Sequence, residues 1–368
     1  MAFRLSAFYF AFFAYGGAYV VYFPLYLASR DLGAVHIAGV LALAPLARMF
    51  APPAWGWLAD LTGAHRAIVA ASCAVTASAF ALLPFTDRIA LVIGVMSVLS
   101  AGALPIVEAI TLGSVAQLGR YGPIRLWGSI GFIVVVLGGG AWLDRYPIST
   151  LPAVLVTFAL ASLAAALALP RAPRHTERAR AAMRITPPFR SVLAAGFCNA
   201  MAHGALYAFL SLHLEGLGYS ATSIGMLWTL GVLAEIVVFL CLPQLFRRFA
   251  LSSVLAASLA LGALRFAALG WMAGELWIVL LAQVLHAATF GAFHAAAVAA
   301  VHRLYPDHAQ ASGQTLFSGV SYGAGAAAGL LLSGWAWDAG GAAGAFSVSV
   351  IACALGAFFA LRLRRAGV

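Results

Sequence analysis

Residues 56–66 read GWLADLTGAHR, and this short polar stretch separates two long apolar runs at residues 36–58 and 67–86. An apolar run of about 20 residues lets an α-helix cross the hydrocarbon core of a bilayer. Similar runs continue along all 368 residues, of which 64% are hydrophobic and 9% charged. Soluble domains average about 25% charged residues. The composition therefore excludes a soluble enzyme and a disordered chain, and it predicts an integral membrane protein.

Short polar segments divide the chain into twelve predicted membrane spans. Continuous runs rich in Ala, Leu and Gly favour helices over the alternating pattern of β-barrel strands. We therefore predict an all-α fold of twelve transmembrane helices in two six-helix bundles. The spans are expected at residues 5–29, 36–58, 67–86, 88–116, 126–143, 149–169, 191–214, 222–245, 251–271, 276–300, 312–337 and 342–361.

One segment near the middle breaks the apolar pattern. Residues 171–190 read RAPRHTERARAAMRITPPFR, with six arginines, three prolines and no apolar run. We predict an N-terminal six-helix bundle at residues 1–170, a cytoplasmic basic linker at 171–190 and a C-terminal six-helix bundle at 191–368. The fifth and eleventh spans both end in a Gly, Trp and Asp cluster: Gly140, Trp142 and Asp144 in one, and Gly334, Trp337 and Asp338 in the other. Related halves of this kind are typical of transporters.

The arginines predict the orientation in the membrane. With twelve spans both termini lie on one side, together with sixteen arginines, whereas only Arg30, Arg88 and Arg145 lie on the other. An excess of basic residues marks the cytoplasmic side. We therefore expect a multi-pass protein of the inner (plasma) membrane with both termini in the cytoplasm. The net charge of +10 reflects this asymmetry, so the expected partners are a small-molecule substrate and lipid, with no nucleic acid, for a chain that functions as a monomer.

Four charged residues, Arg48, Glu108, Glu235 and Arg265, fall well inside predicted spans. A charge at the centre of a membrane helix costs about 2.5–3.5 kcal/mol, and such residues face the protein interior or a watery cavity. They either form salt bridges that lock the bundle, or they act in transport. In the second case a carboxylate carries a coupled proton, and an arginine binds a substrate carboxylate with its two-pronged guanidinium.

Helical spacing collects polar and aromatic residues on three further helix faces. Each set is also compatible with helix packing, or with a histidine bonded to a neighbouring helix. As a site lining, the expected substrate-binding residues are Tyr15, Tyr19, Tyr22, Asn199, His203, Tyr207, Trp228, Gln283 and Phe290, besides Arg48 and Arg265. The expected proton-coupling residues are Glu235, Glu108, His286 and His294.

Cofactor-dependent chemistry has no signature in the sequence. His286 and His294 are eight residues apart, about 12 Å along a helix, too far to share one metal ion. A Walker A sequence is absent, as are HExxH and GxSxG motifs. We therefore expect no metal, no cofactor and no enzymatic activity, with a proton gradient as the energy source.

The loop quoted at the start resembles the G-x-L-a-D-r-x-G-r-r signature of the major facilitator superfamily. The match includes Gly56, Leu58, Asp60, Gly63 and Arg66, whereas leucine and alanine replace two basic residues. The resemblance implies that Gly56, Asp60, Gly63 and Arg66 form a conformational latch. We expect the Asp60 carboxylate either to cap a helix N-terminus or to pair with Arg66.

Three longer stretches resemble the phenylpropionate permease family of that superfamily. They are residues 120–132 (RYGPIRLWGSIGF), 218–235 (GYSATSIGMLWTLGVLAE) and 283–294 (QVLHAATFGAFH). The resemblance implies a proton-linked importer of acids similar to 3-phenylpropionate, and Glu108 stands where relatives can carry Asp. Because related families carry sugars and nucleosides, a proton-coupled sugar or nucleoside symporter is the alternative. A non-transporting membrane sensor is a more remote one.

Overall fold

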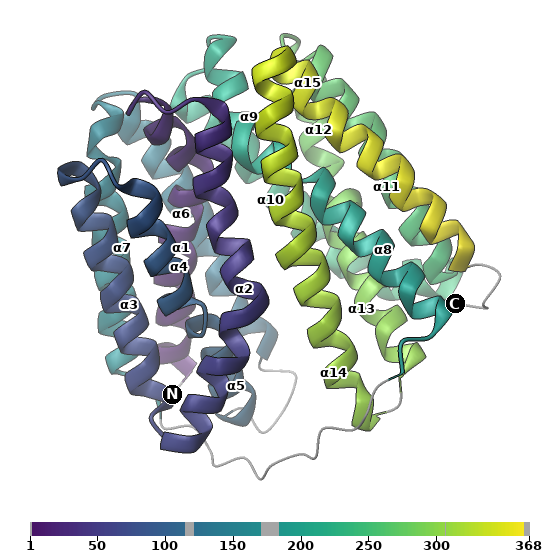
Figure 1. Ribbon diagram of the computed structural model, residues 1–368, viewed down its shortest axis with the longest axis horizontal. Coiled ribbons are helices and arrows are strands. Elements are labelled where there is room, and N and C mark those ends of the chain that lie inside the picture. Colours follow the sequence, from purple (N-terminus) through teal and green to yellow (C-terminus); the bar gives the residue numbers. More distant parts are fainter. Residues whose placement is uncertain (1, 115–120, 171–183, 306, 364–368) are drawn as a thin grey trace. The chain divides into compact units, whose positions relative to one another are not determined.

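The computed structural model describes residues 2–114, 121–170, 184–305 and 307–363. Within these ranges every regular element is a helix (Figure 1). A helix pairs its own backbone N–H and C=O groups, which the hydrocarbon core of a bilayer cannot hydrogen-bond. Some ends have local signals: α8 opens with Pro187 and Pro188, and the Thr186 side chain accepts a hydrogen bond from the Phe189 N–H at 3.4 Å.

The helices of the first half carry the predicted spans one to six. They are α1 (Ala2–Ala28), α2 (Ala34–Thr62), α3 (His65–Leu82), η1 (Leu83–Phe85), α4 (Ile89–Ser100), α5 (Ala103–Ser114), α6 (Tyr121–Leu143), η3 (Ile148–Thr150) and α7 (Leu151–Leu167).

The helices of the second half carry the remaining spans, and two of their elements, η4 and η5, are π-helices. They are α8 (Pro187–Ala202), α9 (Gly204–Gly216), α10 (Ala221–Arg248), α11 (Leu251–Trp271), α12 (Leu276–Val284), η4 (Ala287–Ala292), α13 (Phe293–Leu304), α14 (Asp307–Ser318), η5 (Gly319–Gly325) and α15 (Ala326–Arg362).

The all-helical membrane fold is confirmed. Eleven helices in the described ranges are long and apolar enough to cross a membrane. The last runs from Ser312 to Arg362 and contains both final predicted spans. Gly340 and Gly341 leave the helical conformation inside it, and Gly341 has a φ of 58°, which favours glycine. This kink lies between the predicted spans 312–337 and 342–361.

Two compact units make up the structure. Unit 1 contains residues 1–32, 50–177 and 220–226, and unit 2 contains 33–49, 178–219 and 227–368. Both α2 and α10 are thus divided between the units. The predicted boundary at residues 171–190 stays a prediction, since residues 171–183 lie outside the described part of the chain.

The repeated Gly, Trp and Asp clusters lie against the starts of two helices. In unit 1, Asp144 accepts hydrogen bonds from the backbone N–H groups of Ala221 (2.8 Å) and Thr222 (3.2 Å), the first residues of α10. Hydrogen bonds from Thr222 and Ala221 hold the pKa of Asp144 below its usual range, the Thr222 side chain having the largest effect. Gly140 allows this approach, because a Cβ there would lie 2.6 Å from the Ala221 carbonyl oxygen.

The second cluster makes a related contact inside unit 2. A Cβ at Gly334 would lie 2.6 Å from the Ala38 Cβ and 3.2 Å from the carbonyl oxygen of Ala34, the first residue of α2. Asp338, one helical turn beyond Gly334, is exposed. The two clusters therefore share the close glycine contact, and Asp144 adds a side-chain cap of the helix N-terminus.

Candidate functional site

Arg265 lies at the centre of a buried hydrogen-bond network in unit 2. Its side chain is on α11 and the residue is 1% exposed. Nε donates to the Ala282 carbonyl at 2.7 Å, Nη1 to Thr289 Oγ1 at 3.0 Å and Nη2 to Gln283 Oε1 at 3.2 Å. A buried charge is tolerated when its donors are satisfied. All three of its nitrogens are thus engaged within the protein, as expected of a packing role rather than the predicted substrate contact.

Gln283 extends this network to the neighbouring helix. The residue is 2% exposed, and its Nε2 donates to the Leu227 carbonyl of α10 at 2.9 Å. Its amide oxygen meanwhile accepts from Arg265. Gln283 therefore links α10, α11 and α12, and both ends of its amide are used inside the protein in this conformation.

Glu235 on α10 and His286 at the start of η4 form an acid–imidazole pair. Glu235 Oε2 lies 4.0 Å from His286 Nε2, and their side chains are 19% and 12% exposed. Two glycines lie at this contact, and Gly291 is the one that a side chain would crowd. A Cβ at Gly291 would lie 3.0 Å from the Glu235 Cγ, and one at Gly231 would lie 3.5 Å from the His286 Cδ2. The carboxylate and the imidazole therefore lie close together, and both are partly accessible to solvent.

Aromatic rings surround this pair. The rings of His286 and Phe290 are stacked with centroids 5.3 Å apart, and His203 lies 6.0 Å from His286 and 5.7 Å from Phe290. Tyr207 is stacked on Trp228 at 6.2 Å. The predicted residues of the seventh, eighth and tenth spans are therefore brought together in unit 2.

His203 interrupts the predicted seventh span, because α8 ends at Ala202 and α9 begins at Gly204. Its Nδ1 lies 2.7 Å from the Asn199 carbonyl oxygen. A carbonyl can only accept, so Nδ1 carries the hydrogen. His203 Nε2 and Asn199 Oδ1 are buried and have no hydrogen-bond partner in the described part of the chain. Trp228 is satisfied, since its Nε1 donates to Ser211 Oγ at 3.1 Å.

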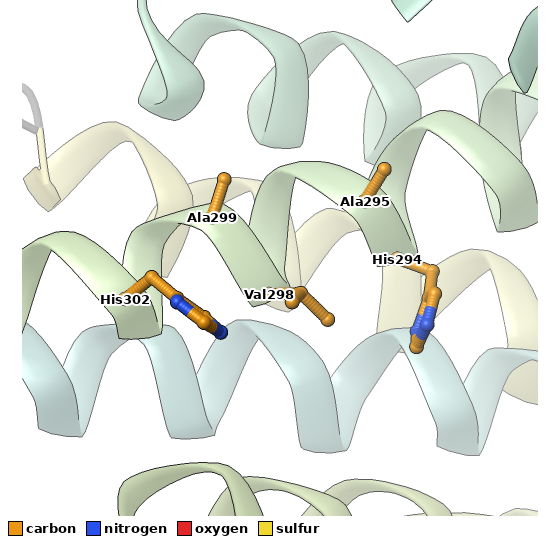
Figure 2. A pocket seen from close by; sticks show the side chains of 5 residues that line it. All are labelled: His294, Ala295, Val298, Ala299 and His302. Carbon is orange, nitrogen blue, oxygen red and sulfur yellow. The ribbon is translucent and has the colours of Figure 1, made fainter. Parts of the chain in front are cut away.

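A second histidine continues the stack. His294 lies 6.3 Å from Phe290, and its Nδ1 is 2.6 Å from the Tyr322 hydroxyl. A cavity of about 490 Å³ is lined by His294, Ala295, Val298, Ala299 and His302 of α13. Figure 2 shows that His294 and His302 extend from the same side of this helix. His294 therefore belongs both to the lining of this cavity and to the ring cluster of His203, Tyr207, His286, Phe290 and His294.

Arg48 approaches the same cluster from α2. The charges of Glu235, Arg265 and Arg48 all act on the Tyr207 hydroxyl. Arg48 lies at an exposed position of α2, in the part of this helix that belongs to unit 2. Of the two intramembrane arginines, it is therefore the more accessible to a ligand.

The tyrosines of α1 lie in unit 1 and are engaged in packing. Tyr22 is 0% exposed and its hydroxyl donates to the Val136 carbonyl at 2.6 Å. Tyr19 stacks on Phe23 at 4.5 Å, and Tyr15 contacts Phe80 edge-on at 5.9 Å. Their predicted substrate role stays a prediction, and the burial of Tyr22 favours the packing alternative.

Glu108 also lies in unit 1. Its basic neighbour is Arg125, which is not one of the four intramembrane charges. The Glu108 Oε1 is 3.9 Å from the Arg125 Nε. The Arg125 guanidinium lies over the Phe13 ring at 4.1 Å and the Tyr9 ring at 5.3 Å. If Glu108 forms a structural salt bridge, its partner in this structure is therefore Arg125 and not one of the other three intramembrane charges.

The loop motif forms a turn with a side-chain hydrogen bond that differs from the predicted pair. Asp60 Oδ1 lies 3.1 Å from the Nε2 of His65, rather than pairing with Arg66. Gly63 has a φ of 66° and turns the chain so that His65, the first residue of α3, faces the last turns of α2. Gly56 lies in α2 and Arg66 in the first turn of α3. Their role as a latch stays a prediction.

Four functional candidates escaped the sequence analysis: Arg125, Gly231, Gly291 and Tyr322. Arg125 lies near a predicted span boundary, where an arginine indicates orientation. The two glycines matter through contacts between helices, which periodicity within one helix does not reveal. Tyr322 lies in a glycine-rich stretch without charged residues, so the sequence does not mark it. The π-helix η4 was also missed, because helical periodicity assumes a regular α-helix throughout the tenth span.

Comparison with known proteins places the chain in a family. The model of the MFS_1 like family matches residues 2–348. The maltose permease of Geobacillus stearothermophilus is 28% identical over 332 residues, which cover 86% of this chain and 82% of the permease. The probable 3-phenylpropionic acid transporter of Escherichia coli (strain K12) is 30% identical over 185 residues, which cover 48% of each chain.

Solved structures show the same fold. The nucleoside transporter NupG superimposes with a TM-score of 0.81 at 18% identity, covering 99% of this chain and 98% of that one. A point mutant of the peptide transporter POT gives a TM-score of 0.77 at 13% identity, covering 99% of this chain and 94% of that one. These relatives are membrane transporters and not enzymes. With the family model matching nearly its whole length, the chain belongs to the MFS_1-like family and is a multi-pass transporter of the major facilitator superfamily.

Proposed function

We propose that the chain is a proton-coupled symporter that imports a small aromatic carboxylate similar to 3-phenylpropionate. The observation that carries the proposal is the Glu235–His286 pair, 4.0 Å apart and bordered by aromatic rings. A carboxylate and an imidazole at this distance can exchange a proton through one bridging water, or directly after a small approach of the side chains. Rings beside such a pair suit an aromatic substrate.

Glu235 is the better supported of the two proton-carrying glutamates. Its partner His286 is a titratable base, so the pair can exchange a proton. Glu108 lies beside Arg125, whose charge is permanent, so this partner cannot accept or return a proton. Among the histidines, His294 bonds to Tyr322 and stands second to His286.

Arg48 is the proposed partner of the substrate carboxylate. Arginine binds carboxylates through two parallel hydrogen bonds, and Arg48 lies near Tyr207 of the ring cluster. Arg265 is unsuited to this role while its three nitrogens are bonded inside the protein. The substrate ring would then contact Tyr207 and Phe290.

The proposed cycle is alternating access, in which the protein exposes its site first to the outside and then to the cytoplasm. The arginine asymmetry supports cytoplasmic termini in the inner membrane. The cycle uses no cofactor, and a single chain supplies all of the residues named. A proton enters on Glu235 with the substrate, and both are released into the cytoplasm.

Uptake of labelled 3-phenylpropionate into proteoliposomes tests the proposal. With a pH gradient of about one unit, acid outside, we expect about tenfold accumulation for a 1:1 symporter, because such a gradient is worth about 1.4 kcal/mol per proton. An uncoupler should abolish the accumulation. Protein-free liposomes correct for passive entry of the neutral acid. Transport that the gradient does not drive would contradict the coupling.

A neutral sugar or nucleoside is the second candidate substrate. The relation to a maltose permease over 86% of this chain supports it, as do the buried acceptors His203 Nε2 and Asn199 Oδ1, which suit a hydroxyl donor. Competition decides between the candidates. If maltose or uridine blocks gradient-driven uptake and 3-phenylpropionate does not, the substrate is the neutral compound.

A further inference from the structure

The π-helix η4 rotates the residues of the tenth span that follow it relative to those that precede it. It runs from Ala287 to Ala292, between α12 and α13. A π-helical turn contains an extra residue and is usually found as a short insertion at functional sites. Without this insertion, the residues after it would rotate by about 100° relative to those before it. His286 immediately precedes η4, and Gly291, which touches Glu235, lies inside it.

Arg265 holds the chain on both sides of His286. Its Nε and Nη2 bond to Ala282 and Gln283, before η4, and its Nη1 bonds to Thr289, inside η4. Thr289 Oγ1 also lies 3.4 Å from the His286 carbonyl oxygen. One rigid, planar guanidinium thus spans the start of the π-helix and ties the end of α12 to Thr289 in its first turn.

The same elements set the geometry of the acid–imidazole pair. Gly291 of η4 packs on the Glu235 side chain, while Gly231 of α10 packs on His286. Gln283 ties α12 to the Leu227 carbonyl of α10. A change in the register of η4 would therefore move Gly291 and His286 relative to Glu235.

We propose that Arg265 is a positioning residue that acts through Thr289: it maintains the π-helical form of η4 and thereby fixes His286 against Glu235. The inference rests on the proposed function, in which this pair handles the proton, and it adds the element that sets the pair's geometry. It also assigns Arg265 a role other than binding the substrate carboxylate.

Several charged or titratable groups face the pair, and they are the background against which a titration is read. They are Arg48 of α2, His203 between α8 and α9, Tyr207 of α9, Arg265 of α11 and Tyr322 of η5. None of them changes in the variants below, which are all substitutions of Thr289.

The test compares three substitutions of Thr289. Thr289→Val keeps the shape and removes the acceptor of Arg265, Thr289→Ser keeps the acceptor, and Thr289→Cys offers a weaker one. The Glu235 carboxyl band is followed by infrared titration of the purified full chain in nanodiscs without substrate. Glu235→Gln identifies the band.

In Thr289→Val we expect the half-intensity pH of this band to move by about 0.5 unit or more, because neighbouring groups at altered distances shift a titration by this order. Thr289→Ser should titrate within about 0.2 unit of the wild type, and Thr289→Cys between the two. If Thr289→Val does not fold, Thr289→Cys against Thr289→Ser makes the same comparison. A titration in Thr289→Val, or failing that Thr289→Cys, that matches the wild type would overturn the proposal.

The titration separates this inference from the proposed function. If Thr289→Val shifts the band while Glu235→Gln still accumulates substrate along a pH gradient, the positioning role stands and the proton assignment fails. If Glu235→Gln is uncoupled while Thr289→Val titrates as the wild type, the proton assignment stands and the positioning role fails.

Discussion

The two units each contain a partly exposed glutamate beside a basic side chain, but the basic partners differ in kind. In unit 1, Glu108 lies 3.9 Å from Arg125, and that guanidinium also lies over the Phe13 ring at 4.1 Å. In unit 2, Glu235 lies 4.0 Å from His286. Arginine keeps its charge at all accessible pH values, whereas histidine gains and loses a proton near neutrality. The difference teaches that similar distances can join a glutamate to a partner of permanent charge in one unit and, in our proposal, to a proton-exchanging partner in the other.

The largest expected effect comes from neutralising each glutamate in turn. Glu235→Gln should reduce gradient-driven accumulation about tenfold, to the equilibrium level, for a gradient of one pH unit. It should retain exchange of internal for external substrate, because exchange needs no net proton movement. Glu108→Gln should accumulate within about twofold of the wild type. The reverse ranking would place the proton on Glu108.

The two accessible arginines provide the second comparison. Arg48→Gln should raise the KM for an aromatic carboxylate about tenfold, the effect of losing about 1.4 kcal/mol of binding, and Arg48→Lys should recover part of it. Arg125→Gln should leave the KM within about twofold and lower thermal stability instead, since it removes the partner of Glu108. Initial rates over a range of substrate concentrations give both KM values. An unchanged KM in Arg48→Gln would show that Arg48 does not bind the carboxylate.

A smaller effect is expected from adding one methyl group beside the unit 2 pair. In Gly291→Ala the new Cβ would lie 3.0 Å from the Glu235 Cγ and from the Val238 Cγ1, so the pair must shift. We expect the maximal transport rate to fall about threefold to tenfold, or about 1 kcal/mol. Gly319→Ala is the matched control, because Gly319 also lies in a π-helix but has open space around its Cα. Equal rates in the two variants would argue against a close-packed pair.

The smallest effect concerns the capped helix start at Asp144. Asp144→Asn should lower stability at neutral pH by about 0.5 kcal/mol, because the amide keeps one acceptor oxygen but loses the second acceptor and the negative charge that favours a helix N-terminus. Asp338→Asn should have no effect, because it removes no cap. The lowered pKa of Asp144 means that its contribution is present above the ordinary aspartate pKa of about 3.9. The contribution is lost as the pH falls through the lowered folded value.

Thermal unfolding of the wild type and Asp144→Asn between pH 3 and pH 8 measures this contribution. The two proteins should differ by a constant amount above about pH 5 and converge at about pH 3. A difference that grows on acidification would have the wrong sign for a capping carboxylate.

The fold was predictable because its cause is local. Runs such as residues 36–58 are long and apolar enough to span a bilayer wherever they occur, and the structure has helices there. The kink at Gly340–Gly341 also falls between two predicted spans. The interruptions at His203 and at η4 were not predicted, since an apolar run has the same composition whether its helix is continuous or broken.

The candidate site was predictable in its residues but not in its pairings. A charge inside an apolar run is conspicuous, so Arg265 and Glu235 were found. That Arg265 bonds to Thr289 while Glu235 meets His286 depends on the approach of separate helices. Glycines 231 and 291 lie at that contact, and a single sequence without contacts does not indicate which helices meet.

Proton movement during transport tests the central claim most directly. A pH dye outside proteoliposomes in weak buffer, with no initial gradient, reports protons that enter with added 3-phenylpropionate. We predict that the medium around wild-type and Glu108→Gln proteoliposomes becomes more alkaline, beyond the passive signal of protein-free liposomes. Glu235→Gln should give only the passive signal. Alkalinisation by Glu235→Gln equal to that of the wild type would contradict the account.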